Sequence, residues 1–186
     1  KLLKDIGKEE DKTMTRFLIG AAYHDLAKIK ANSEVVRKVY QKLLREKVPA
    51  KMIIFCQHLE MLNKAEIWAR EIGIEDIGII HGGVSNHARN VIVHDFQEMK
   101  LELLCATMSS CGTGLTLTAA SEVIFLELNW QKGVVDQAID RTHRIWQTKT
   151  VEVTKIVCGG SLDEWILKSE SGKKKMQTLL LQASRK

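Results

Sequence analysis

Short aliphatic runs alternate with longer amphipathic segments along most of this chain. The aliphatic runs lie at residues 52–56, 77–80, 101–106, 123–126 and 151–158. The first of them reads Met-Ile-Ile-Phe-Cys, and a strand with apolar side chains at consecutive positions has to be covered on both faces. Coverage by helices on both sides is typical of a parallel sheet. The sequence therefore predicts an α/β fold, a three-layer α/β/α sandwich around a parallel sheet.

The amphipathic segments predict the helices of this fold. Apolar residues recur at helical spacing over residues 59–72, 86–99, 134–145 and 161–169. Two further helices precede the first strand, one over residues 14–30 and one that begins after Ser33, whose short side chain can cap free backbone amides. Pro49 ends the second of these helices.

The domain organisation follows from length and composition. With 186 residues, of which 45% are hydrophobic, the chain fits one domain better than two. We divide it into a helical linker or brace region (1–48), an α/β lobe (49–170) and a basic tail (171–186). These leading helices form the N-terminal extension of the lobe.

The charge of the chain favours an acidic partner. The formal net charge is +5 and the isoelectric point is about 9.0. The excess gathers near the C-terminal end, at Lys168, Lys173, Lys174, Lys175, Arg185 and Lys186. Nucleic acid is the natural acidic partner of such a chain. Many basic proteins bind none, so the charge supports a nucleic-acid partner without deciding it.

Cysteine and histidine usage bears on location and metal binding. The four cysteines lie far apart in apolar surroundings without a C-x-x-C pair, so we expect reduced thiols. The six histidines lack metal-ligand spacing, so we expect no structural metal site. No run approaches the ~18 apolar residues of a membrane span. We expect an intracellular protein, nuclear in a eukaryote and cytoplasmic in a bacterium, archaeon or phage, and a fragment of a longer chain because no methionine begins it.

Residues 137–147 place two arginines, an aspartate and two glutamines on a short segment of helical periodicity. One polar stripe then consists of Gln137, Asp140, Arg141 and Arg144. The opposite, mostly apolar stripe consists of Val135, Ala138, Thr142 and Ile145. Two guanidinium groups one turn apart suit the oxygens of a transferring phosphoryl group. A solvated charged face has the same pattern, so the segment alone leaves both interpretations open.

A second candidate for phosphate chemistry is the loop at residues 107–120. Gly112 and Gly114 allow tight turning and close approach of a ligand, and the hydroxyl groups of the loop supply donors for phosphate or ribose. A lone Gly-x-Gly is also typical of a plain strand-to-helix turn. The Gly172-Lys173 pair is no Walker A motif, because no glycine-rich loop precedes it and Lys174 replaces the required serine or threonine.

In order and spacing, these elements resemble the C-terminal RecA-like lobe of the SNF2 family of superfamily 2 helicases, which has the P-loop NTPase type of fold. The resemblance covers about residues 51–168. The string Gln-Ala-x-Asp-Arg-x-His-Arg-Ile-x-Gln at residues 137–147 is similar to motif VI of that family, and residues 114–120, with the following strand and Glu127-Leu128-Asn129-Trp130, are similar to motif V and its sequel. Thr116 and Glu-Leu-x-Trp resemble the annealing-helicase branch.

The chain departs from the family pattern at several positions. Cys111 and Trp146 stand where the family usually has glycine, Gln131-Lys132 where it has Asn-Pro, and His81-Gly82-Gly83 where it has Asp-Gly-Ser. These departures leave the lobe recognisable. A bulky Trp146 beside the arginines can change how residues 137–147 pack against the lobe, or can itself pack on a neighbouring surface.

The resemblance implies a two-lobe motor that binds ATP with Mg²⁺ in the cleft between the lobes. This lobe would give Arg141 and Arg144 to the γ-phosphate, Gln137 would position the arginine segment, and Asp140 would hold a guanidinium. The Walker A lysine and the acidic Mg²⁺ ligands are expected from an N-terminal RecA-like lobe of the same polypeptide. The chain alone is therefore expected to be inactive as a DNA-dependent ATPase.

The resemblance also implies contacts with double-stranded or forked DNA. Gly112, Gly114 and Thr116 would couple the nucleotide cleft to the nucleic-acid track, and Gly112 and Gly114 would also line the nucleotide site. The expected nucleic-acid contacts are Arg89, Thr107, Thr116 and Trp130.

Two rival functions stay open. The first is a non-catalytic nucleic-acid-binding or interaction module that keeps the RecA-like fold. The second is a stand-alone Rossmann-like enzyme, which needs a glycine-rich loop after the first strand, where Cys56-Gln57-His58 offers none.

Overall fold

The computed structural model describes residues 9–111, 115–129, 131–142 and 150–168. Its centre is a five-stranded sheet with the strand order β2-β3-β1-β4-β5. The strands are β1 (Met52–Cys56), β2 (Ile77–Ile80), β3 (Leu103–Thr107), β4 (Glu122–Phe125) and β5 (Glu152–Lys155). Every pair of neighbouring strands is parallel, so the predicted parallel sheet is confirmed.

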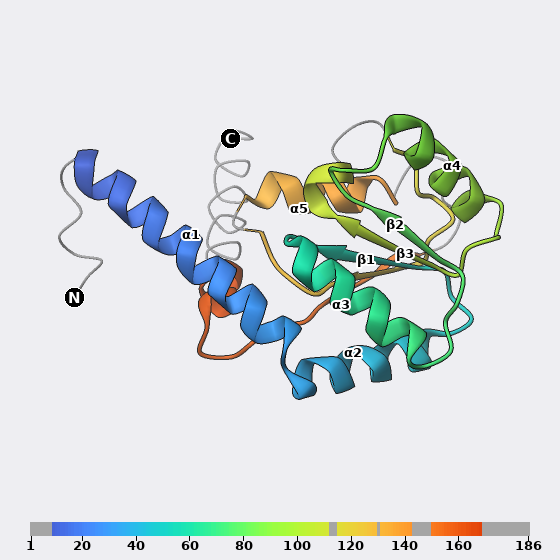
Figure 1. The fold of residues 1–186 in the computed structure, drawn as a ribbon, viewed down its shortest axis with the longest axis horizontal. Coiled ribbons are helices and arrows are strands. Elements are labelled where there is room, and N and C mark those ends of the chain that lie inside the picture. Colours follow the sequence, from blue (N-terminus) through green and yellow to red (C-terminus); the bar gives the residue numbers. More distant parts are fainter. Residues whose placement is uncertain (1–8, 112–114, 130, 143–149, 169–186) are drawn as a thin grey trace, which may run out of the picture.

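Helices cover both faces of this sheet (Figure 1). They are α1 (Glu9–Ala31), α2 (Glu34–Lys47), α3 (Leu59–Arg70), α4 (Asn86–Gln97) and α5 (Lys132–Asp140), with a short 3₁₀ helix, η1 (Met108–Cys111). A further helical segment spans residues 162–168. The predicted cap of α2 is confirmed, because Ser33 Oγ accepts a hydrogen bond from the Val36 amide at 3.3 Å.

Two apolar cores, one on each face, explain the three layers. Side chains alternate along β1, so Ile53 and Phe55 face one core and Ile54 faces the other. The first core contains Phe96 of α4 and apolar residues of α5. The second contains apolar residues of α2 and α3. All five residues of β1 and all five of β3 are buried, as the three-layer prediction requires of the central strands.

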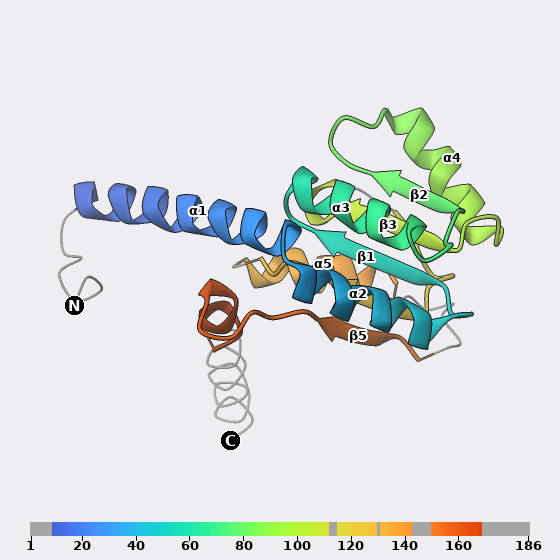
Figure 2. The same cartoon turned by 60° about the horizontal axis from the view of Figure 1, so that its bottom comes forward.

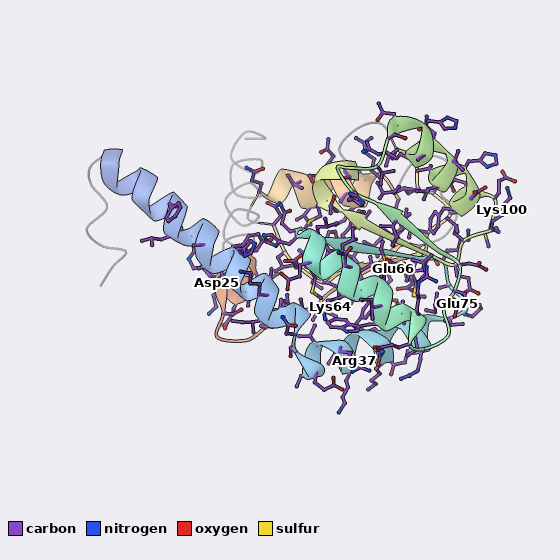
Figure 3. All side chains as sticks on the ribbon, viewed as in Figure 1. Asp25, Arg37, Lys64, Glu66, Glu75 and Lys100 are labelled. Atoms are coloured by element: carbon purple, nitrogen blue, oxygen red, sulfur yellow. The ribbon has the colours of Figure 1, made fainter. Side chains whose placement is uncertain are left out.

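Helices α2 and α3 pack against the same face of the sheet and lie next to each other in Figure 1. Tyr40 donates its hydroxyl to the Ala65 carbonyl at 3.2 Å, and Gln41 Nε2 donates to the Trp68 carbonyl at 2.9 Å. Arg37 of α2, labelled in Figure 3, pairs with Glu71 after α3 at 2.9 Å. Helix α2 is thus part of the helical layer of the lobe.

Helix α1 extends beyond the sheet as an arm (Figures 1 and 2). Phe17 and Leu18 in its outer part are 71% and 51% exposed, whereas Tyr23, Leu26 and Ala27 nearer its end are buried. None of the helices within the described residues is long and apolar enough to cross a membrane.

Several boundaries differ from the sequence prediction; helix α1, for example, begins at Glu9 rather than at residue 14. Within the described residues, α5 ends at Asp140 rather than at residue 145, because the amide and the hydroxyl of Thr142 both bond to the Ile139 carbonyl, at 2.9 and 2.7 Å. Such bonds from a threonine compete with continuation of a helix. Strand β5 is also shorter than expected and covers only residues 152–155 of the run at residues 151–158.

A buried ion pair joins α1 to the far end of the chain. Lys30 and Asp163 are each 1% exposed, and Lys30 Nζ lies 2.6 Å from Asp163 Oδ2. Lys30 also donates to the Ile156 carbonyl at 2.9 Å, and Asp163 accepts from the Cys158 amide at 3.2 Å. These hydrogen bonds compensate for the loss of hydration of both charges. The pair fixes α1 against the segment that follows β5.

Removal of one partner is expected to destabilise the protein strongly. The variant Asp163→Asn leaves the Lys30 ammonium buried without its counter-charge, and the free energy of unfolding should fall by about 3–5 kcal/mol. Urea unfolding measures this loss. The double variant Lys30→Met/Asp163→Leu should recover part of it, because apolar side chains need no counter-charge, whereas the Ile156 carbonyl and the Cys158 amide still lose their partners.

The control is Glu34, an exposed carboxylate that pairs with Arg37 at 3.0 Å and with Lys38 at 3.9 Å. Glu34→Gln should cost no more than about 1 kcal/mol. An equal and small loss in Asp163→Asn would contradict the structural role of the buried pair.

Candidate nucleotide and nucleic-acid site

The loops at the carboxyl ends of β1 and β4 are held together by one buried carboxylate. Glu127 is 2% exposed, and its Oε2 accepts hydrogen bonds from the backbone amides of Gln57 at 2.8 Å and His58 at 2.9 Å. Its Oε1 lies 2.7 Å from His58 Nδ1. His58 occupies the N-cap position of α3 without a capping bond from its own side chain. Glu127 therefore supplies, from the loop after β4, the negative charge that favours the start of α3.

Two hydrogen bonds of Asn129 extend this network to α5. Asn129 Nδ2 donates to Gln57 Oε1 at 2.8 Å, and Asn129 Oδ1 accepts from the Gln131 amide at 2.8 Å. Gln131 is the N-cap residue of α5. The start of the helix that carries the candidate arginine segment is thus tied to the loop after β1.

Helix α1 packs against the same network. The rings of Tyr23 and His24 lie 5.1 and 5.3 Å from the His58 ring, centroid to centroid. Burial, with the nearby charge of Glu127, raises the pKa of the Tyr23 hydroxyl well above its ordinary value, so the phenol stays protonated. The leading helix therefore contributes to the edge of the sheet at which the loops meet.

The chain between β3 and β4 crosses one face of the sheet. Parallel strands begin at the same edge, so residues 108–121 have to return from the carboxyl end of β3 to the amino end of β4. Leu115, Leu117 and Ala120 are buried in the core that contains apolar residues of α4 and α5. We call residues 115–120 the crossing segment. It lies on the α4 and α5 face of the sheet.

Hydrogen bonds from both sides hold the crossing segment. Gln97, at the end of α4, donates from Nε2 to the Thr116 carbonyl at 2.8 Å and accepts at Oε1 from the Ala119 amide at 2.9 Å. The Leu117 amide donates to the Arg141 carbonyl at 2.9 Å. The segment that resembles motif V is therefore bonded directly to the segment that resembles motif VI.

The arginine segment separates into a packed and a presented face where the structure describes it. Val135, Ala138 and Thr142 are buried, whereas Gln137 and Asp140 are exposed. Arg141 is half-buried and lies in the turn after α5 rather than within a longer helix. Arg144 lies outside the described residues. The catalytic roles of these residues stay predictions.

The predicted nucleic-acid contacts lie in different surroundings. Thr107 is buried, and its hydroxyl is 2.6 Å from Ser110 Oγ. Arg89 is half-buried on α4, with Nη2 3.4 Å from the Val84 carbonyl. Thr116 is partly exposed in the crossing segment. Their contacts with nucleic acid stay predictions.

Several predicted site residues lie outside the described part of the chain. They are Gly112, Gly114, Trp130 and Arg144, together with the departure at Trp146. Among the described residues, no group of three or more histidine, cysteine, aspartate or glutamate side chains is placed to hold a metal ion.

Sequence reasoning missed the roles of Gln97 and Glu127. Glu127 carries a signal, because it is a lone charge directly after the apolar run at residues 123–126. A charge in such a place needs partners when it is buried. Gln97 carries no such signal, since a polar residue at the end of an amphipathic helix is ordinary.

Two features define the class of the protein as a RecA-like lobe. They are the order of the strands and the hydrogen bond between the crossing segment and Arg141. The model of the family "Helicase conserved C-terminal domain" matches residues 34–146, and the chain belongs to this family. The solved structure of the C-terminal part of the Fun30 ATPase domain superposes with a TM-score of 0.69 at 24% identity, over 75% of this chain and 45% of that one, and supports the fold.

Relatives of similar sequence carry several names. The human DNA annealing helicase and endonuclease ZRANB3 is 35% identical over 127 residues, which cover 68% of this chain and 12% of that protein. The putative ATP-dependent helicase/translocase YwqA of Bacillus subtilis is 33% identical over 114 residues, which cover 61% of this chain and 12% of that protein. These findings confirm the C-terminal RecA-like lobe of an SNF2-type helicase. Membership of the annealing-helicase branch stays a prediction.

Loss of the Glu127 carboxylate is expected to destabilise the loop after β1. In Glu127→Ala the amides of Gln57 and His58 lose their acceptor, at about 1–3 kcal/mol for each donor that stays buried. Glu127→Gln keeps an acceptor oxygen and should cost less. Urea unfolding of both variants measures the difference, with Glu60→Ala on the exposed side of α3 as the control. Equal stability of Glu127→Ala and Glu60→Ala would contradict a stabilising role of the Glu127 hydrogen bonds.

Proposed function

We propose that this chain is the C-terminal lobe of an ATP-dependent SNF2-type DNA translocase or helicase. In this proposal it supplies arginine side chains and DNA-backbone contacts, which couple ATP hydrolysis to movement on DNA or to its remodelling. The observation that carries the proposal is the hydrogen bond between the Leu117 amide and the Arg141 carbonyl at 2.9 Å. It joins the proposed arginine segment to the proposed DNA-coupling segment within a chain of the helicase family.

Arg141 has the chemistry for stabilising a transferring phosphoryl group. A guanidinium is always protonated and presents planar pairs of N–H donors, which fit phosphoryl oxygens. Its place in a turn, beside the exposed Gln137 and Asp140, allows it to reach a group presented from outside the lobe. ATP supplies the phosphoryl group whose transfer to water releases free energy. An arginine in this role is typically worth about 10³–10⁵ in rate.

The neighbours of Arg141 have supporting roles in the proposal. Arg144 is the second arginine of the pair. Asp140 accepts a charge-assisted hydrogen bond from a guanidinium and so limits its rotation. Gln137, one turn earlier on the same exposed face, positions the segment against the nucleotide.

The proposal assigns DNA to the α4 and crossing-segment side of the lobe. Arg89 would contact the phosphate backbone, and Thr116, with Gly112 and Gly114, would couple this contact to the nucleotide. Thr107 and Trp130 complete the proposed nucleic-acid set. Contacts to phosphate give affinity and orientation rather than sequence specificity.

The rest of the active site is assigned to a second lobe of the same polypeptide. This chain spans 12% of the length of the relatives described above. Mg²⁺ takes oxygen ligands from one or two carboxylates and from the phosphates. We place these carboxylates and the Walker A lysine in the N-terminal lobe, so ATP turnover requires both lobes.

The isolated chain is therefore expected to be silent as an ATPase. Phosphate release is measured for the purified 186-residue chain with and without duplex DNA, beside the full-length protein as the positive control. No turnover above background is expected from the chain alone. DNA-stimulated turnover by the chain would contradict the division of the site between two lobes.

The two arginines are expected to be required for turnover but not for DNA binding. In the full-length protein, Arg141→Ala or Arg144→Ala should lower kcat by about 10³-fold or more. DNA affinity at a fixed salt concentration should change little. Arg45→Ala, on the exposed side of α2, is the matched control and should leave both quantities unchanged.

The same assay separates this function from a non-catalytic binding module, which the basic composition of the chain would also suit. Salt-dependent DNA binding by a full-length protein without any ATPase activity would favour the module. Unchanged turnover in both arginine variants would remove the proposed role of the arginines.

A further inference from the structure

Gln97 bonds to the same peptide group that contacts Arg141. Its Nε2 donates to the Thr116 carbonyl, and the Leu117 amide donates to the Arg141 carbonyl. The carbonyl of Thr116 and the amide of Leu117 belong to one peptide unit, which is planar and rigid. A rotation that Gln97 imposes on one end of this unit is therefore passed to the other end.

The side chain of Gln97 is fully engaged in holding the crossing segment. Beside the bond to Thr116, its Nε2 lies 3.4 Å from Thr118 Oγ1, and its Oε1 accepts from the Ala119 amide. Gln97 is half-buried, so loss of the amide would leave the carbonyl of Thr116 and the amide of Ala119 without this partner. The three bonds fix the crossing segment relative to the end of α4.

Helix α4 connects Gln97 to the side of the lobe assigned to DNA. Arg89 and Gln97 lie on this one helix, which begins at the Ser85 cap and is intact over Asn86–Gln97. A helix of this length moves as a rigid rod, about 12 Å from Arg89 to Gln97 at 1.5 Å per residue. Figure 3 labels Lys100, just beyond Gln97, at the outer end of α4. A displacement of α4 at Arg89 therefore displaces Gln97.

We propose that Gln97 is a positioning residue that couples DNA contact on α4 to the placement of Arg141, through the peptide unit between Thr116 and Leu117. This inference rests on the proposed function. The path runs from α4 through the amide of Gln97 and one peptide plane to the carbonyl of Arg141, and it contains two hydrogen bonds. In the proposed arrangement, neither the Gln97 side chain nor the peptide unit contacts ATP.

The test uses the full-length protein and two substitutions of Gln97. Gln97→Met has a similar length and makes none of the three bonds. Gln97→Glu keeps an acceptor for the Ala119 amide but, as a carboxylate, cannot donate to the Thr116 carbonyl. Glu98→Gln, at the exposed next position, is the matched control. ATP turnover is measured at varied ATP concentration with saturating duplex DNA.

Both Gln97 variants should lose about 10²-fold in DNA-stimulated kcat, the cost of a small misplacement of a catalytic group. The KM for ATP should change by less than about threefold, because the path sets the position of Arg141 in the transition state and not ground-state binding. Glu98→Gln should match the wild type. A loss in Gln97→Met alone would assign the effect to the Ala119 bond and overturn the proposed path.

Hydrogen exchange supplies a readout that does not depend on activity. In Gln97→Met, peptides that cover residues 115–120 should exchange faster, while those of β1 should not change. Thermal unfolding checks that each variant is folded, and if Gln97→Met unfolds, Gln97→Glu decides the question. Wild-type exchange rates with wild-type DNA stimulation would overturn the role of Gln97 and leave the proposed function standing. Failure of the proposed function shows separately, as a wild-type protein without DNA-stimulated turnover.

Discussion

Parallel pairing of the strands forces every connection to return across a face of the sheet, and this constraint places the functional segments of the lobe. Helices α4 and α5 and the crossing segment all return on the same face, so they share one core. Within that core the unpaired backbone groups of the crossing segment need partners. Gln97 and Arg141 supply them. The topology thus brings Leu117 and Arg141, which are 24 residues apart in sequence, into direct hydrogen-bond contact.

Polar groups buried at a few positions fix how the apolar layers are joined. The Lys30–Asp163 pair ties α1 to the end of the lobe, and Glu127 ties the loops after β1 and β4. Each of these groups loses its hydration on burial, and several hydrogen bonds compensate for that loss. Removal of one partner alone is therefore expected to lower the stability of the fold. Apolar packing alone allows neighbouring elements to slide. These polar contacts instead specify one arrangement of α1, α3 and α5 around the carboxyl edge of the sheet.

Local sequence patterns predicted the helices and strands, but they could not predict hydrogen bonds between residues far apart in the sequence. The strands at Met52–Cys56 and Ile77–Ile80 and the Ser33 cap follow from apolar runs and capping chemistry. The end of α5 was placed too late, because the bonds of Thr142 to Ile139 outweigh the continuing periodicity. Motif resemblance singled out Arg141, whose catalytic role stays a prediction, but the partner of its carbonyl depends on the fold. No local pattern marks Gln97, whose bonds reach 19 to 22 residues along the chain.

In the proposed function, this lobe presents Arg141 to a nucleotide held by a second lobe. A structure of the full-length protein with duplex DNA and a mimic of the transferring phosphoryl group measures this most directly. We expect the Arg141 guanidinium nitrogens to lie about 2.7–2.9 Å from oxygens of the mimic, with the hydrogen bond from the Leu117 amide to the Arg141 carbonyl retained. If duplex DNA and the mimic are both bound and the Arg141 guanidinium still stays within its own lobe, away from the mimic, the proposed role of Arg141 is contradicted.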